Sequence, residues 1–126
     1  YTIEMKIYLS HASGYDYESE LYTPLKASDI AATHKILFPH DKENIDINSK
    51  NLVQHWDLVI AEVSRPSTGQ GIELGWASSS DTAILCIYRT GSKVSSSLKF
   101  ITCDLIEYSD EADMLIKLSA WLKTKQ

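Results

Sequence analysis

The chain has 126 residues, with 23% charged and 44% hydrophobic side chains and a net charge of −5. This length fits one domain over residues 1–126, and the acidic balance argues against a nucleic-acid polymer as a partner. No apolar run approaches the roughly 20 residues that span a bilayer, so we expect no membrane association. Cys86 and Cys103 lie in apolar runs and are expected to be buried thiols, which favours a cytoplasmic location. Met5 would make a natural start, so residues 1–4 are expected to be a cloning remnant.

Apolar and polar segments alternate along the chain. The apolar ones are predicted to be strands at Met5–Ser10, Lys35–Pro39, Leu58–Ala61, Thr82–Tyr88 and Phe100–Tyr108. Helices are predicted at Glu18–His34, with a break or restart at Pro24, and at Ser49–Trp56, Ile72–Ser79 and Asp110–Lys125. Residues 40–47 are acidic and predicted to be a mobile loop.

Strands that alternate with helices predict an α/β fold with a parallel sheet covered on both faces. Right-handed crossovers make a doubly wound, flavodoxin/Rossmann-like sheet of five strands in the order 2-1-3-4-5 the leading topology. Ligands of such sheets bind beyond the carboxyl ends of the strands. The predicted cleft therefore collects Ser10–Gly14, Ser64–Gly71 and Arg89–Ser97, which follow strands one, three and four.

Residues 57–77 carry the strongest signal for chemistry, because a strand, a glycine-containing loop and a helix follow one another there. Glu73 is expected in the first turn of that helix, where an acidic residue often only complements the helix dipole. Gly69 and Gly71 would let the backbone pass close to a ligand, and Gly75 would let the helix approach a neighbour. These glycines favour a site for a small anionic molecule.

The block G-Q-G-I-E-L-G-W-A after D-L-V-I-A-E-V resembles the nucleoside 2-deoxyribosyltransferase superfamily, and within it the 2′-deoxynucleoside 5′-phosphate N-hydrolases. The resemblance implies that Glu73 is a nucleophile that attacks the anomeric carbon of the sugar and releases the base. It also implies that Tyr8, in I-Y-L, orients Glu73. The alternative for Tyr8 is an ordinary strand aromatic.

The motif P-S-T-G-Q-G separates the branches of this superfamily. Ser67 stands where the resemblance implies an aspartate in transferases and a serine in phosphate-preferring hydrolases. We therefore expect an anion nest from Ser67, Gly69 and Gly71 at the helix start, with Ser13 and His11 of the first loop as further phosphate contacts. The alternative for His11 is an exposed loop residue with no role.

The resemblance also implies a homodimer with shared active sites, in which Ser96 reaches the phosphate of a neighbouring subunit. Ser95 and Ser97 are register alternatives, and Trp76 and Tyr88 are candidate interface aromatics. The plain alternative is that this serine run is a solvated loop.

One position departs from the family pattern. The aspartate that assists protonation of the leaving base is replaced by Ser49, and Asp46 could substitute for it only if the helix starts differently. The leading hypothesis is therefore hydrolysis of a (deoxy)nucleoside monophosphate, with a deoxyribosyltransferase or a non-catalytic nucleotide sensor as alternatives. Ser67 and the short C-terminus speak against the transferase. S-H-A-S-G also resembles the first loop of TIR-like domains, whose other motifs are absent. No cofactor and no metal are expected.

Overall fold

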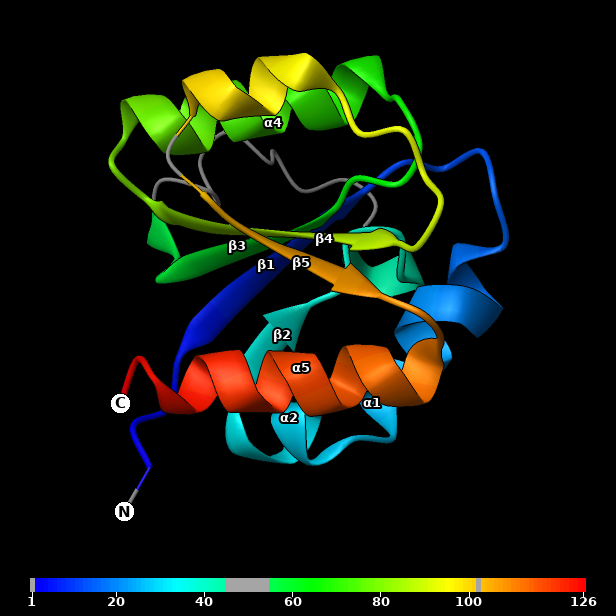
Figure 1. Ribbon diagram of the computed structural model, residues 1–126. Helices are drawn as coiled ribbons and strands as arrows, with labels where there is room; N and C mark the ends of the chain where they lie inside the picture. Colours follow the sequence, from blue (N-terminus) through cyan, green and yellow to red (C-terminus); the bar gives the residue numbers. More distant parts are fainter. Residues whose placement is uncertain (1, 45–54, 102) are drawn as a thin grey trace.

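The computed structural model describes residues 2–44, 55–101 and 103–126. Five parallel strands form one sheet in the order β2-β1-β3-β4-β5, which confirms the predicted topology (Figure 1). The strands are β1 Lys6–His11, β2 Lys35–Leu37, β3 Leu58–Glu62, β4 Ala83–Arg89 and β5 Asp104–Tyr108. The chain runs from β1 outward to β2 and then from β3 outward to β5, so the sheet changes winding direction between β1 and β3.

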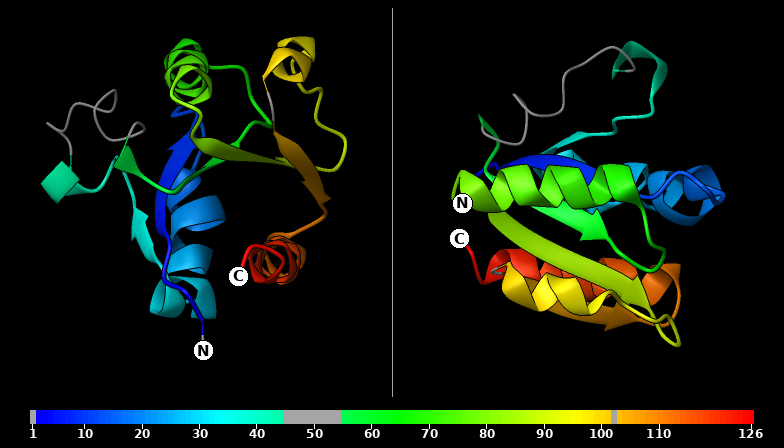
Figure 2. Two further views of the ribbon diagram at one scale, coloured as in Figure 1. Left: turned by 90° about the vertical axis from the view of Figure 1, so that its left-hand side faces the viewer. Right: turned by 90° about the horizontal axis from the view of Figure 1, so that it is seen from above.

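Helices cover both faces of this sheet. They are η1 Glu18–Tyr22, α1 Thr23–Lys26, α2 Asp29–Thr33, η2 Lys42–Asn44, α4 Thr68–Ser79, η3 Ser96–Phe100 and α5 Glu111–Lys123. Figures 1 and 2 show α4 and η3 above the sheet, with α1, α2 and α5 below it. The two chain ends lie close together, where the Ile3 backbone N–H donates to Gln126 Oε1 at 2.6 Å. Within the described ranges, no helix is long and apolar enough to cross a bilayer.

The strands divide their side chains between two cores, as the two-residue period of a strand requires. On β1, Ile7 and Leu9 pack into the core shared with α1, α2 and α5. Tyr8, between them, packs into the core under α4. The face of β1 that carries Tyr8 is therefore the face that α4 covers.

Local chemistry moves several boundaries away from the predicted ones. Pro24 is tolerated near the start of α1, after the π-helical turn η1, and the main interruption comes later, at Ser28 before α2. The last strand begins at Asp104 rather than Phe100, because Ser95 caps a 3₁₀ helix that ends at Phe100. Cys86 is buried as predicted, whereas Cys103 is only half-buried. Most of the predicted helix Ser49–Trp56, including Ser49 itself, and Asp46 lie outside the described residues.

Candidate active site

Helix α4 begins four residues earlier than predicted. Ser67 is its N-cap, with extended backbone and a side-chain oxygen that accepts a hydrogen bond from the Gln70 backbone N–H at 3.3 Å. The Gly71 N–H donates to the Ser67 carbonyl at 3.1 Å, which closes the first turn. Glu73 therefore lies in the second turn, beyond the positions where a carboxylate serves as a cap. The expectation that it occupies the first turn is wrong.

The early start also changes the predicted anion nest. The Gly71 amide is consumed by the helix, whereas the amides of Thr68 and Gly69 belong to the first turn and have no acceptor within it. A Cβ added at Gly69, Gly71 or Gly75 would meet nothing within 4 Å. Gly75 therefore does not mediate a close helix contact, contrary to expectation.

Two hydroxyls of β1 hold the Glu73 carboxylate. The Tyr8 hydroxyl donates to Glu73 Oε2 at 2.5 Å, and Ser10 Oγ donates to Oε1 at 3.0 Å. Tyr8 is 1% exposed and Ser10 is fully buried. The structure thus brings the predicted pair Tyr8 and Glu73 together. Each carboxylate oxygen has its own donor, so the group is fixed in position and orientation.

Ser10 was missed as a site residue by sequence reasoning. Tyr8 and Ser10 are two apart on one strand, so they project from the same face. That spacing was the available signal. Because the face also carries α4, both hydroxyls reach the same carboxylate.

Gln70 was also missed, and it fixes α4 to the sheet. Its buried Nε2 group donates to the carbonyl of Ser10 at the end of β1, at 3.1 Å, and to that of Glu62 at the end of β3, at 2.8 Å. These two neighbouring strands flank the point where the sheet changes winding direction, which is where open α/β sheets bind ligands. Gln70 thereby holds Glu73, one turn further on, over that point.

A cleft of about 290 Å³ opens beside this carboxylate. Its lining comprises His11, Ser13, His40, Ser67, Gly69, Gln70, Ile72, Glu73 and Trp76. It therefore brings together five of the predicted site residues, Glu73 itself included. Tyr8 contacts Glu73 but does not line the cleft, and Gly71 and Ser96 are not part of this lining either.

A second, larger cavity of about 580 Å³ lies beside the start of α4 and reaches the loop after β4. Ser67 and Gln70 line both cavities, and Gly71, Lys93, Ser95 and Ser97 line the larger one. The single predicted cleft is therefore two hollows that meet at the α4 N-terminus. Ser95 and Ser97 thus share a cavity with Ser67 within one chain.

His11 is 6% exposed, not the exposed loop residue that one interpretation expected. Its Nδ1 lies 2.7 Å from the carbonyl of Ala12, and its Nε2 lies 2.6 Å from the Tyr22 hydroxyl. A carbonyl only accepts, so Nδ1 carries the proton and Nε2 accepts from Tyr22. Burial lowers the pKa of His11 to about 4. The hydrogen bond to the Ala12 carbonyl raises this pKa, but its effect is smaller than that of burial. The ring is therefore neutral at physiological pH.

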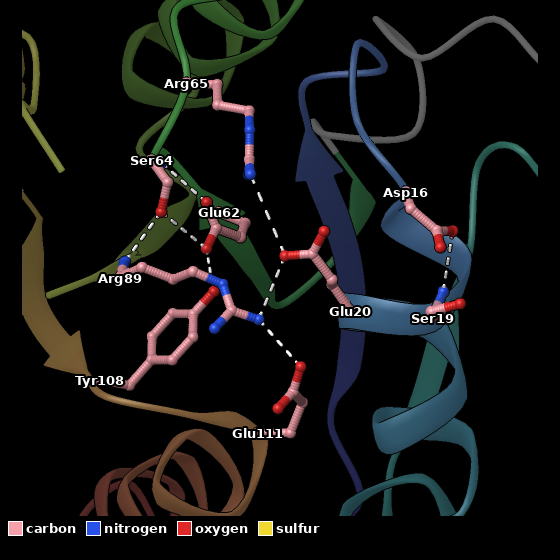
Figure 3. Close-up of polar contacts among 9 residues, drawn as sticks. All are labelled: Asp16, Ser19, Glu20, Glu62, Ser64, Arg65, Arg89, Tyr108 and Glu111. Carbon is pink, nitrogen blue, oxygen red and sulfur yellow. Dashed lines mark hydrogen bonds and ion pairs between the residues drawn. The ribbon is translucent and has the colours of Figure 1, made fainter.

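A separate polar cluster lies at the ends of β3, β4 and β5 (Figure 3). The buried Glu62 carboxylate accepts from the Ser64 N–H at 2.7 Å, from Ser64 Oγ at 2.9 Å and from the Tyr108 hydroxyl. Arg89 pairs with Glu20 at 3.2 Å and with Glu111 at 2.9 Å. These contacts join the strand ends to η1 and α5, and Glu62 is enclosed by protein donors rather than presented to a cleft.

No group of three or more His, Cys, Asp or Glu side chains in the described part of the chain is arranged to hold a metal ion. The cleft instead offers one fixed carboxylate, hydroxyls, backbone amides and an aromatic wall. A carboxylate held in this way can attack an electrophilic carbon, and the amides at the α4 N-terminus can receive an anion.

Comparisons with known proteins extend this description. No family model matches the chain. A segment of 36 residues is 47% identical to a Trichoplax adhaerens protein provisionally named 2′-deoxynucleoside 5′-phosphate N-hydrolase 1. The match spans 29% of this chain and only 25% of the length of that protein. Clostridium botulinum CMP N-glycosidase BcmB has a similar structure, with a TM-score of 0.67 and 19% identity over 90% of this chain and 98% of that one.

The short sequence match supports the resemblance to the nucleoside 2-deoxyribosyltransferase superfamily. The structural similarity shows a shared fold, and the sequence match adds a short segment of high identity. The α/β sheet predicted from the sequence is thus found in this chain, and a solved structure of similar length shares its fold.

Proposed function

We propose that this chain is an N-glycosidase that hydrolyses (deoxy)nucleoside 5′-monophosphates, with Glu73 as the nucleophile. The observation that carries the proposal is the Glu73 carboxylate, which is held by Tyr8 and Ser10 at the edge of a cleft on the sheet's switch point. The names of the Trichoplax and Clostridium proteins, an N-hydrolase and an N-glycosidase of nucleotides, support the same reaction class.

The reaction has two steps. One Glu73 oxygen forms a bond to the anomeric carbon while the bond from that carbon to the base nitrogen breaks, and its electron pair leaves with the base. Water then attacks the glycosyl ester at the anomeric carbon and restores the carboxylate. Tyr8 and Ser10 keep the carboxylate in one orientation, which reduces the entropy lost on reaching the transition state.

The 5′-phosphate binds at the N-terminus of α4 in this proposal. Ser67 and the amides of Thr68 and Gly69 lie where the helix dipole favours an anion. Ser67 also lies where the two cavities meet, so Lys93, Ser95 and Ser97 of the larger one are close to the same region. Ser13 lines the smaller cavity on the β1 side and is available to the phosphate. His11 lines it as well, but its two ring nitrogens are bonded to the Ala12 carbonyl and the Tyr22 hydroxyl, so it has no N–H left to donate to the phosphate.

The activity test is release of free base, followed by chromatography, from a panel of nucleosides and their 5′-monophosphates, with and without an acceptor base. We expect free base alone, with a higher kcat/KM for monophosphates. Glu73→Gln should lower activity by at least about 1,000-fold, because the nucleophile is lost. Glu18→Gln, a change at an exposed position on η1, is the matched control. Base exchange would indicate a transferase, and nucleotide binding without release would indicate a sensor.

We also propose a homodimer, on the family resemblance, in which the Ser95–Ser97 segment serves a neighbouring site. The competing hypothesis is that this segment serves the site of its own chain, because Ser95 and Ser97 line the same cavity as Ser67. One inactive variant carries Glu73→Ala, and the other has Ser95, Ser96 and Ser97 all replaced by alanine. Mixing the two should restore activity only if each active site is shared between subunits. A fully active monomer would contradict the dimer.

A further inference from the structure

We propose that His40 donates the proton that the base takes up as it leaves. This inference rests on the proposed function and adds a catalytic residue to the same cleft.

The leaving base needs a proton because the electron pair of the broken bond would otherwise leave it as an anion. General acid catalysis of such a step typically contributes about 100- to 10,000-fold. The donor must be a group in the cleft whose protonated form is populated near neutral pH. Histidine is the side chain whose ordinary titration best meets this need.

The other candidate donors in the cleft are already committed. His11 is neutral, its single proton is bound to the Ala12 carbonyl, and burial lowers its pKa to about 4. Glu73 accepts from Tyr8 and Ser10, and it must be ionised to attack. Ser13, Ser67, Gln70 and Trp76 have no readily dissociable proton. Among the described residues that line the cleft, His40 is the remaining titratable group.

The backbone around His40 is held although its side chain is exposed. The His40 N–H donates to the Tyr22 hydroxyl at 3.1 Å, and the Asp41 N–H donates to the Phe38 carbonyl at 3.1 Å. His40 follows β2, which pairs with β1, so it lies at the same sheet edge as Ser10 and His11. A fixed backbone with an open side chain suits a group that must meet a ligand.

The surroundings of His40 include several titratable groups. The His11 ring of β1 lies 4.9 Å from the His40 ring and the Tyr17 ring lies 5.1 Å from it, while Tyr22 of η1 accepts its backbone N–H. The adjacent Asp41 is paired with Lys26 of α1 at 2.8 Å. From α4, Glu73 lines the same cleft.

The proton and electron balance of the first step is complete. The Glu73 oxygen bonds to the anomeric carbon, the bond to the base nitrogen breaks, and the His40 imidazolium gives its proton to the base. The neutral base leaves, and His40 is left neutral. In the second step, His40 takes a proton from the attacking water, so both groups return to their starting states.

The test compares His40→Gln with wild type on two substrates that differ in how readily the base leaves. If purines are accepted, the pair is guanosine monophosphate and 7-methylguanosine monophosphate. If pyrimidines are accepted, it is uridine monophosphate and 5-nitrouridine monophosphate. The first member of each pair needs the acid, whereas the second releases a base that needs little or no protonation. We expect kcat/KM, which reports the base-release step and not the later attack of water, to fall about 100-fold or more on the first substrate and only a few-fold on the second.

The pH profile gives a second readout. Wild-type kcat/KM on the ordinary substrate, which reports the base-release step, should fall as the pH rises and the acid loses its proton, and this fall should be absent in His40→Gln. His55→Gln, a change at an exposed histidine outside the cleft lining, is the control and should behave as wild type.

Three results would overturn the inference. Equal losses on both substrates would indicate a positioning or structural role, and no loss on the ordinary substrate would exclude His40 as the acid. A wild-type chain that hydrolyses neither substrate would refute the proposed function itself, together with this inference. The fold is checked by thermal unfolding. If His40→Gln unfolds at the same temperature as wild type, a loss of activity does not come from a loss of folded protein.

Discussion

The Glu73 carboxylate accepts hydrogen bonds from two hydroxyls of different acidity, the Tyr8 phenol and the Ser10 alcohol. Hydrogen bonds to an ionised acceptor stabilise it by about 1.5–3 kcal/mol each. Such bonds orient a nucleophile, and they also stabilise its charge in the resting state. Their value to a reaction lies in geometry, because the bonded carboxylate cannot rotate away from the cleft.

Replacement of Tyr8 by Phe tests this orientation. We expect kcat to fall by about 10- to 100-fold with a small change in KM, because Tyr8 contacts the nucleophile and not the substrate. The measurement is steady-state hydrolysis of the best monophosphate. Ser10→Ala should cause a smaller loss, because Oε1 is then still free to accept from water. A Tyr8→Phe variant with wild-type kcat would show that the phenol serves only to pack the core.

At the scale of elements, the site depends on how α4 joins the sheet. Gln70 donates to the carbonyls at the ends of both β1 and β3. One side chain therefore aligns α4 with β3, the strand that precedes it in the chain, and with the neighbouring strand β1. Ser67 begins the helix, and Gln70 and Glu73 come one turn apart after it. The position of the nucleophile is thereby tied to the two central strands.

Gln70→Leu should destabilise the fold. The change leaves the Ser10 and Glu62 carbonyls without this donor in a buried environment, and we expect a loss of about 2 kcal/mol in the free energy of unfolding. Urea unfolding followed by circular dichroism measures it. Thr68→Ala, at an exposed position in the first turn of the same helix, is the control. Equal stability of Gln70→Leu and wild type would contradict the bridging role.

The sequence carried enough information to predict the order of the strands and the meeting of Tyr8 with Glu73. Apolar runs identify strands without reference to the rest of the chain, and the motif resemblance identified the pair. The start of α4 could not be predicted in the same way, because Pro66, Gly69 and Gly71 disfavour a helix locally. The Ser67 cap and the Gln70 contacts with the sheet override that preference.

The remaining misses depend on tertiary neighbours. His40 lies in a polar stretch that gives no local signal of a role, and it reaches the cleft only because β2 pairs with β1. Ser95 and Ser97 come close to Ser67 through the pairing of β3 with β4 and the turn into η3. Such contacts are set by strand order, so they become visible only when the topology is known.

At the scale of the whole molecule, polar side chains link distant segments inside the fold. The Glu62 and Arg89 cluster joins strand ends to η1 and α5. A second link runs from His11 of β1 through the Tyr22 hydroxyl of η1 to the His40 backbone after β2. This second link contains a titratable ring that must be neutral to accept from Tyr22, so the stability of the fold depends on pH through His11.

The sign of this dependence follows from the pKa of His11, which burial lowers from 6.5 to about 4. The folded state binds fewer protons than the unfolded state between these values, so the stabilisation is complete above about pH 6.5 and is lost as the pH falls toward 4. At about pH 5 we expect the free energy of unfolding to be about 2 kcal/mol lower than at about pH 7.5, from the linkage relation.

His11→Gln removes the titration and should lack this part of the pH dependence, whatever its absolute stability. His55→Gln, at an exposed histidine, should keep it. The measurement is the free energy of unfolding in urea at both pH values for the three proteins. Parallel losses in wild type and His11→Gln would show that acid sensitivity arises elsewhere.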